Sequence, residues 1–391
     1  MKTPLTALTA LFMSFFTFSQ TGIELKINSG ILGEDRIVDI HIPESYSESE
    51  LNYPVIYCLD GEYSQMIVNG TVDFYAYIDK TPECIVVSIR QNYFNSDSTE
   101  FKRWEDCSYS WKSGLLNEKG ERFKHFIEKE LIPTIDKEYR TSPYRALIGH
   151  SYTASFVNHF LLDNTPLFSA YIAISPYYGE NMYDTLKTQI QNLSTPIFYF
   201  TTYGENDLSG HQQSVNKFNE EFSALESENF NYLLYNTEGN QGTHYTIYPK
   251  ALPFAIEFIF SPYAPISEDE LMKIIEIEDK VNYLMERYAT IEKLYGNKLE
   301  VREDDFYMVV YAAQEKKQMD QVKLLSEWCI KTYPENTIGY SLMGEYEEQM
   351  KNYEKALDFY QNAYDRLPED TTNKVDFYED IERMQKKLKG E

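Results

Sequence analysis

Positive charge, cysteine and long apolar segments are all scarce in this chain of 391 residues. Its 36 Lys and Arg residues face 62 Asp and Glu residues, which leaves a formal net charge of −26. Nucleic acids and anionic membrane surfaces would be repelled by such a chain, so neither is expected as a partner. After the N-terminus no apolar run is long enough to cross a bilayer, so membrane insertion is not expected either.

The four cysteines are Cys58, Cys84, Cys107 and Cys329. They lack the close spacing of zinc-binding pairs, so no metal site is expected, and no organic cofactor is needed for the chemistry inferred below. Cys58 and Cys84 lie in or beside apolar segments, which favours buried thiols. A Cys58–Cys84 or Cys84–Cys107 disulfide is the alternative.

The N-terminus has the pattern of a secretory signal peptide. One Lys precedes a short run rich in Leu and Phe, and the small residues Thr17 and Ser19 occupy positions −3 and −1 of a cleavage site. We therefore predict that residues 1–19 are a signal peptide and that the mature protein is exported, either to the periplasm or as a secreted protein.

Strand and helix patterns alternate from residue 20 to residue 262. Two segments, 22–32 and 36–43, alternate apolar and polar residues as half-buried antiparallel strands do. Nearly continuous apolar runs follow at 53–60, 83–90, 145–150, 170–175, 196–204 and 230–236. Amphipathic helical segments lie at 120–139, after Ser151, at 210–226 and at 248–260. The order predicts an α/β domain with a mostly parallel sheet, helices on both faces and an antiparallel edge.

Residues 268–391 are helical by period, and Pro262, Pro265 and Ser267 mark the linker before them. Part of this region resembles tetratricopeptide repeats, whose packing positions would be filled by Tyr340, Met343, Gly344, Tyr353, Ala356, Tyr360, Ala363 and Pro368. Pro334 precedes Pro368 by one 34-residue period, and a weaker copy would use Phe306, Val309, Val322 and Cys329. A generic helical hairpin is the alternative. Such a module could bind a partner protein, cover one side of the α/β domain, or self-associate.

Three residues follow successive strands in the order Ser, acid, His. A serine hydroxyl becomes a good nucleophile when an oriented histidine removes its proton during attack. Ser151 follows the strand at 145–150, Asp207 follows the strand at 196–204, and His244 follows the strand at 230–236. Glu205 is the alternative acid, although Asp207 is favoured by its position three residues after Gly204.

The other histidines near these strands are weaker candidates. His150 is expected to pack under the turn that carries the serine, and His211 to lie in the first turn of a helix.

An oxyanion formed on attack would need two backbone N–H donors. One is expected from Tyr152, directly after the serine. The other is expected from Glu62, with Gly61 as the alternative, in the turn after the strand at 53–60. Asp60 is interpreted as a turn-forming residue.

The long segment 92–114 is the candidate substrate wall because it connects a strand to the next helix and carries Trp104, Tyr109 and Trp111. Aromatic side chains there would suit a flat or aryl-bearing substrate. The cations Arg90, Lys102 and Arg103 could meet an anionic group on the ester or pair with acidic surface residues.

These motifs together resemble the putative esterase family of α/β hydrolases, which includes enterochelin-type siderophore esterases, S-formylglutathione hydrolases and feruloyl esterases. The resemblance runs through "YPVIYCLDGE", "FKHFIEKELIPTIDKEYRT", "RALIGHSYTASF", "PLFSAYIAISP" and "THYTIYPKALPFAIEFIF". It implies an α/β-hydrolase fold and a serine esterase with nucleophile Ser151, base His244 and an acid at Asp207 or Glu205. It also implies oxyanion donors at Tyr152 and after Asp60-Gly61.

The chain departs from the family pattern where glycines normally follow, at Thr153 and Ala154. We expect a slightly shifted turn that still works, because the strained residue of such a turn is the serine itself. The sequence thus predicts an exported serine esterase acting on a siderophore-type ester or an acylated carbohydrate or aryl ester. The alternative is an inactive binding protein on the same fold, which would be favoured if the Ser151 hydroxyl could not reach His244.

Overall fold

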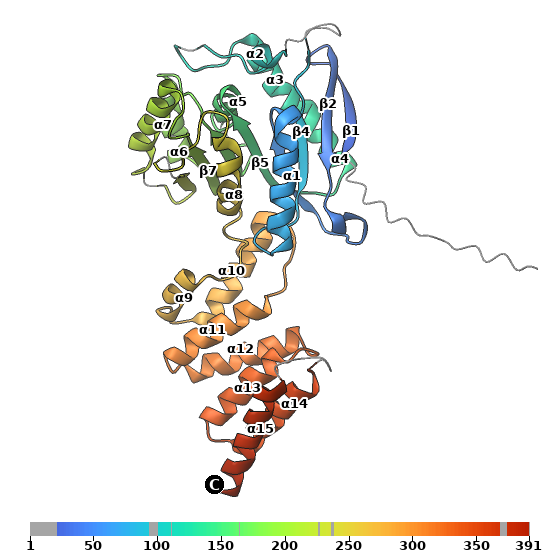
Figure 1. Cartoon of the computed structure of the whole chain (residues 1–391), viewed down its shortest axis with the longest axis vertical. Helices are drawn as coiled ribbons and strands as arrows, with labels where there is room; N and C mark the ends of the chain where they lie inside the picture. Colours follow the sequence, from blue (N-terminus) through green and yellow to red (C-terminus); the bar gives the residue numbers. More distant parts are fainter. Residues whose placement is uncertain are drawn as a thin grey trace, which may run out of the picture.

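A computed structural model describes residues 22–93, 101–110, 112–163, 165–225, 227–235, 238–367 and 374–390. The predicted signal peptide therefore lies outside the described residues. Figure 1 shows an α/β part and a helical part that extends from one end of it.

One sheet organises the α/β part, with the strand order β1-β2-β4-β3-β5-β6-β7-β8. Strands β3 to β8 are parallel, and β1 and β2 form the predicted antiparallel edge. The bounds are β1 (Ile23–Ser29), β2 (Glu34–His41), β3 (Tyr53–Cys58), β4 (Ile85–Ile89), β5 (Thr141–His150), β6 (Ala170–Ile174), β7 (Ile197–Thr202) and β8 (Phe230–Leu234). Every strand expected from the sequence is present, and the central strands are buried on both faces as continuous apolar runs predict.

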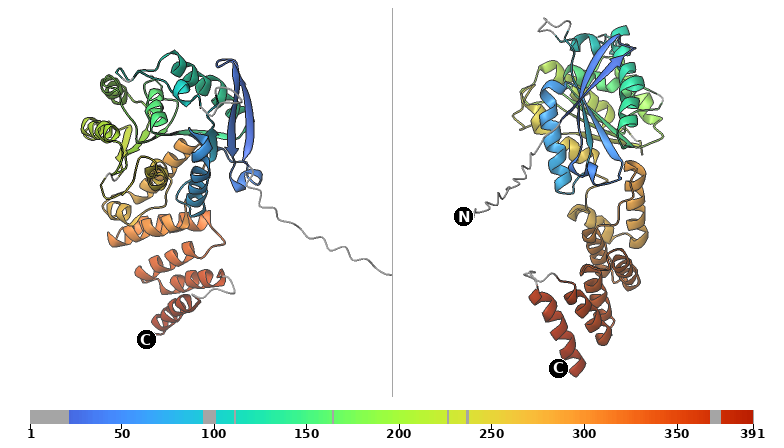
Figure 2. Two further views of the ribbon diagram at one scale, coloured as in Figure 1. Left: turned by 45° about the horizontal axis from the view of Figure 1, so that its top comes forward. Right: turned by 90° about the vertical axis from the view of Figure 1, so that its right-hand side faces the viewer.

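Helices cover both faces of this sheet (Figure 2). One face packs against α1 (Gly61–Tyr77) and α8 (Ile247–Ile259). The other packs against α3 (Glu118–Phe126), the π-helical turn Ile127–Leu131, α4 (Ile132–Glu138), α5 (Tyr152–Val157), α6 (Met182–Gln191) and α7 (Ser209–Phe222). The short helix α2 (Arg103–Asp106) lies in the connection from β4 to α3, and 3₁₀ turns lie at Glu44–Ser47 and Asn158–Phe160.

Helices α1 and α6 were not predicted from the sequence. In α1 the buried positions are occupied by Gly61, Ser64 and two valines, while large side chains such as Met66 and Tyr77 are exposed. An apolar stripe is the main signal of an amphipathic helix, and here the stripe is obscured because large apolar residues also lie on the exposed side of α1.

The helical part consists of α9 (Glu268–Ile275), α10 (Lys280–Tyr295), α11 (Glu303–Glu315), α12 (Met319–Thr332), α13 (Ile338–Gln349), α14 (Tyr353–Asp365) and α15 (Lys374–Lys389). The Ser267 side chain caps α9 by accepting a hydrogen bond from the N–H of Glu270, as the start signal predicted. Gly344 lets α13 approach α14 closely, because a Cβ atom there would lie 2.7 Å from the Tyr360 ring. No helix in the described part of the chain is long and apolar enough to cross a bilayer.

The helical part docks at the edge of the sheet where the parallel strands begin. Tyr144, near the start of β5, donates its hydroxyl hydrogen to the carbonyl of Ile259 at the end of α8. Its ring centroid lies 4.9 Å from that of Tyr295 in α10, and Arg302 pairs with Asp79 after α1. Buried apolar residues of this interface and of the sheet form one continuous cluster.

All four cysteines are buried and free, so neither of the two disulfides considered above is formed.

Candidate active site

Ser151 sits on a strained turn between β5 and α5. Its backbone has φ 60° and ψ −118°, a conformation that non-glycine residues rarely adopt. The turn is tight, because a Cβ atom on Gly149 would lie 2.6 Å from the carbonyl carbon of Thr153. The strain is therefore carried by the serine, as expected, and Thr153 lies within α5 with no positive φ.

The structure brings Ser151, His244 and Asp207 together in one chain of hydrogen bonds. Ser151 Oγ lies 2.8 Å from His244 Nε2, and His244 Nδ1 lies 2.6 Å from Asp207 Oδ1. Because the Asp207 carboxylate can only accept, Nδ1 carries the proton and Nε2 is left to accept from the serine. The hydroxyl thus reaches the imidazole, whereas the inactive alternative would have been favoured by a hydroxyl that could not reach it.

Asp207 is held by four donors. Its side chain is fully buried and accepts from His244, from the Ser175 hydroxyl, and from the N–H groups of Gly204 and Leu208 at 3.1 and 2.7 Å. Burial alone would raise the pKa of this carboxyl group, but the hydrogen bonds outweigh burial and lower the pKa to about 2. The carboxylate is therefore ionised at neutral pH.

The alternative acid, Glu205, points elsewhere. Its carboxylate accepts from the N–H of Gln241 at 3.1 Å. The loops after β7 and β8 are joined by a bond from the N–H of Asn206 to the carbonyl of Gly242, 2.8 Å long. Because the loops pair in this way, the side chain of Asp207, and not that of Glu205, lies beside His244.

Two further histidines border the site, and both are neutral at neutral pH. Burial lowers the pKa of His150 to about 4, and its Nε2–H donates to the backbone carbonyl of His244 at 2.7 Å. Burial also lowers the pKa of His211, whose Nδ1–H donates to the carbonyl of Ser175 at 2.7 Å. His211 lies in the first turn of α7, as predicted. His150 is buried, with its ring centroid 5.1 Å from that of His244 and 5.5 Å from that of Tyr248.

The predicted oxyanion donors lie at the starts of two helices. Tyr152 is the first residue of α5, and Glu62 is the second residue of α1. Asp60 caps α1 with a left-handed backbone, φ 59°, so it does form the turn. The Glu62 carboxylate accepts from the N–H of Gln91 at 2.5 Å, which ties this turn to the end of β4.

Comparison with known proteins supports the same interpretation of the fold. Residues 29–223, which include Ser151 and Asp207, match the sequence family described as Putative esterase. Residues 29–223 belong to that esterase family. The domain that contains them is therefore an esterase domain, that is, a serine hydrolase that acts on ester bonds. His244 and the helical part lie beyond the matched segment. No curated protein sequence matches this chain.

Solved structures share the fold of the esterase domain. A crystal structure of an uncharacterised protein from Capnocytophaga ochracea is 21% identical, with a TM-score of 0.71, and covers 93% of this chain and 99% of its own. An IroE-like serine hydrolase from Shewanella oneidensis is 21% identical, with a TM-score of 0.55, and the match covers 79% of this chain and 98% of the hydrolase. Siderophore hydrolase EstA from Aspergillus nidulans is 17% identical, with a TM-score of 0.51, and the match covers 67% of this chain and 100% of EstA.

The three predicted substrate-wall residues of the esterase domain have different surroundings. Trp104 is 60% exposed, and its ring centroid lies 4.4 Å from that of Tyr152. Tyr109 is buried and stacks on Tyr152, with the ring centroids 4.9 Å apart. Trp111 lies outside the described residues.

The three cations considered in the sequence, Arg90, Lys102 and Arg103, are each paired with an acid. Arg90 pairs with Asp39, Lys102 with Glu34, and Arg103 with Asp60. Of the two roles considered for these cations, the structure places them in ion pairs.

Sequence reasoning assigned no role to Ser175, and it treated Thr153 only as a departure from the family pattern. Ser175 follows β6, the strand beside the nucleophile strand, and its left-handed backbone (φ 52°) turns its hydroxyl toward Asp207. A polar residue at the carboxyl end of a buried parallel strand was the available signal.

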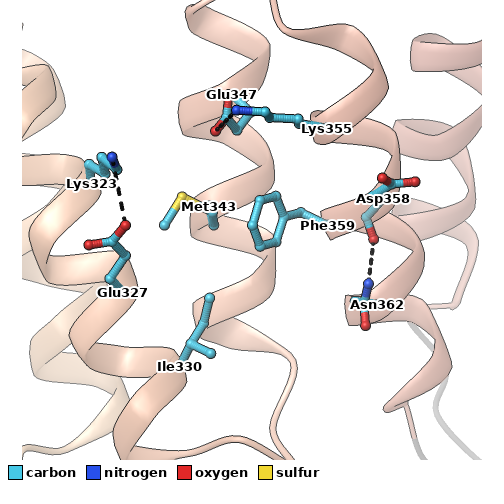
Figure 3. Close-up of a pocket in the computed structure, with 9 residues that line it drawn as sticks. All are labelled: Lys323, Glu327, Ile330, Met343, Glu347, Lys355, Asp358, Phe359 and Asn362. Carbon is cyan, nitrogen blue, oxygen red and sulfur yellow. Dashed lines mark hydrogen bonds and ion pairs between the residues drawn. The ribbon is translucent and has the colours of Figure 1, made fainter.

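A hollow of about 570 Å³ lies in the helical part, away from the esterase site. Figure 3 shows that it is lined from α12, α13 and α14, with Met343 and Phe359 between residues of both charge signs. Lys323 faces Glu327 at 3.8 Å, and Lys355 faces Glu347 at 3.9 Å.

Proposed function

We propose that this protein is an exported serine esterase that hydrolyses a carboxylic ester through an acyl-enzyme. The observation that carries the proposal is the unbroken hydrogen-bond chain from Ser151 through His244 to Asp207. The arrangement has the partners and order that activate a serine hydroxyl.

In the first half of the reaction Ser151 Oγ attacks the ester carbonyl carbon while His244 Nε2 takes the hydroxyl proton. The resulting imidazolium gives that proton to the departing alcohol oxygen, which leaves an acyl-serine. In the second half His244 takes a proton from water, the hydroxide attacks the acyl carbon, and the proton returns to Ser151 as the carboxylic acid leaves. The charged Asp207 stabilises the imidazolium in both halves.

The oxyanion in both tetrahedral intermediates is proposed to be held by the backbone N–H groups of Tyr152 and Glu62. Both residues open helices, where the N–H groups point out of the helix end and the dipole favours negative charge. Gly61 is the alternative second donor.

The substrate is proposed to be a siderophore-type ester or an acylated carbohydrate or aryl ester. Exposed apolar side chains adjoin the site in sequence, namely Trp104, Tyr245, Leu208 and Tyr63. Trp104 and Trp111 are proposed to contact the substrate, with Tyr109 supporting the ring of Tyr152 from beneath. The fold shared with the siderophore hydrolase is consistent with such an ester.

Two further parts of the proposal concern the chain ends. Residues 1–19 are proposed to direct export. Residues 268–391 are proposed to form a tetratricopeptide-like module that binds a protein partner or a second copy of this chain. Its packing residues Phe306, Val309 and Ala356 are buried, as that repeat requires.

The test is covalent labelling by a fluorophosphonate probe, comparing the mature protein with Ser151→Ala and His244→Ala. We expect strong labelling of the wild type, none of Ser151→Ala, and labelling at least 100-fold slower in His244→Ala. A folded wild type that neither labels nor cleaves short-chain aryl esters would favour the binding-protein alternative.

A further inference from the structure

Asp60 is a buried carboxylate for which the proposed mechanism has no use. It is 1% exposed and directly precedes the Gly61-Glu62 turn that is proposed to hold the oxyanion. A buried carboxylate is costly unless it is well paired, so its partners show what the residue maintains.

Arg103 binds both oxygens of Asp60. Its Nε donates to Oδ1 at 2.6 Å and its Nη2 to Oδ2 at 2.9 Å, which is the side-by-side geometry of a strong arginine–carboxylate pair. Nη2 also donates to the backbone carbonyl of His150 at 2.9 Å. One guanidinium therefore contacts both the turn after β3 and the residue before the nucleophile.

Thr153 completes the connection from the other side. Its hydroxyl donates to Asp60 Oδ2 at 2.8 Å and accepts from the N–H of His150 at 2.9 Å. The side chain is fully buried. This is the position at which the usual G-x-S-x-G pattern has glycine, which could make neither hydrogen bond.

Burial disfavours the charge of Arg103, but its hydrogen bonds to Asp60 outweigh that effect and raise the pKa of the guanidinium. The Arg103 guanidinium therefore keeps its charge, and arginine does not act as a proton donor in proteins. Its contacts with Asp60 and His150 thus point to a role in holding the position of these residues.

The two proposed oxyanion donors belong to the two turns that these contacts join. Tyr152 lies between Ser151 and Thr153, and Glu62 lies two residues after Asp60. Oxyanion stabilisation requires both donors to be preorganised within a fraction of an ångström, because donors that must move at the moment of reaction lose most of their effect.

We propose that Asp60, Arg103 and Thr153 are positioning residues that fix the separation of the two oxyanion-binding turns, with Thr153 replacing the glycine of the usual pattern. The inference rests on the proposed esterase function. The same contacts also position Trp104, because the preceding residue Arg103 holds helix α2 beside Asp60.

The matched pair Thr153→Ser and Thr153→Val tests this. Serine keeps the hydroxyl, whereas valine keeps the shape and removes both hydrogen bonds. We expect kcat per fluorophosphonate-titrated site to stay within about threefold for serine and to fall about 30-fold or more for valine, with KM changed less than threefold. Inhibition by a phenylboronic acid, which forms a tetrahedral adduct on the serine, should weaken by a similar factor in the valine variant.

Counting titrated sites separates positioning from simple unfolding, because misfolded molecules do not label. If Thr153→Val does not fold, Arg103→Lys decides, since it keeps the charge at a partly exposed position but loses the forked contact with Asp60. We expect it to lower kcat about tenfold.

An active wild type whose valine or lysine variant keeps kcat within threefold would overturn the positioning role while leaving the esterase proposal intact. A wild type that does not label would instead count against the proposed function itself, and the inference would fall with it.

Discussion

Replacing Asp207 by Asn tests which acid orients His244. Both Asp207 oxygens accept hydrogen bonds: Oδ1 from His244 and the N–H of Leu208, and Oδ2 from Ser175 and the N–H of Gly204. An amide has one accepting atom and one donating atom. In either orientation its NH₂ group therefore meets donors, and when that group faces His244 the imidazole must take the tautomer that cannot accept from Ser151.

The expected loss follows from the tautomer and the charge together. An Asp-to-Asn change in an equivalent arrangement costs about 10⁴-fold in kcat. We expect Asp207→Asn to lower kcat by about 10³- to 10⁴-fold, which corresponds to about 4 to 5 kcal/mol in the activation free energy. The assay is steady-state hydrolysis of 4-nitrophenyl acetate, with the folded fraction of each variant measured by circular dichroism.

Glu205→Gln is the matched control. It makes the same chemical change two residues away, on a side chain whose contact is with Gln241 and not with the imidazole. Its kcat should stay within about twofold of the wild type. The reasoning is refuted if Glu205→Gln loses activity while Asp207→Asn retains it within threefold.

Three more predictions concern stability and the turn. Buried His150 and His159 have pKa values lowered to about 4 and about 3, so between pH 6.5 and pH 4 the unfolded chain binds protons that the folded chain does not. The free energy of unfolding should therefore fall by about 2 kcal/mol for each histidine from pH 7 to pH 5. In urea titrations at both pH values, His159→Gln should remove the contribution of His159 and leave that of His150. Gly149→Ala should abolish labelling or soluble expression, because the added methyl group would lie 2.6 Å from the backbone of Thr153, and retention of wild-type kcat would contradict the tight turn. Tyr295→Ala should lower the free energy of unfolding by about 3 kcal/mol, measured by urea titration, yet leave kcat per titrated site within about twofold because the residue lies at the opposite edge of the sheet.

The sheet was predictable because each of its strands has a plain apolar pattern. The runs at 53–60 and 145–150 coincide with β3 and β5 to within a few residues, and the alternating segments before them form the antiparallel edge. In contrast, α1 was missed because it carries large apolar residues on its exposed side as well as on its buried side. The exposed Met66, Phe74 and Tyr77 obscure the apolar stripe that would mark the helix.

At the site, chain order was enough to nominate Ser151, His244 and two acids, because parallel strands end at one edge. It could not choose between Asp207 and Glu205, since that choice depends on how the loop after β7 pairs with the loop after β8. The partners of Asp60 were beyond reach for a similar reason. Arg103 and Thr153 are distant from it in sequence and meet it only through the tertiary fold.

Strand β5 runs from the helical part to the serine turn. Tyr144 near its start is anchored to α8 and α10, and His150 at its end leads into the serine turn. The described helices α9 to α15 therefore extend from the edge of the sheet where β5 begins, away from the edge where it ends (Figure 1). A molecule bound to the helical part at a distance from the sheet would therefore leave the edge of the sheet that carries Ser151 uncovered.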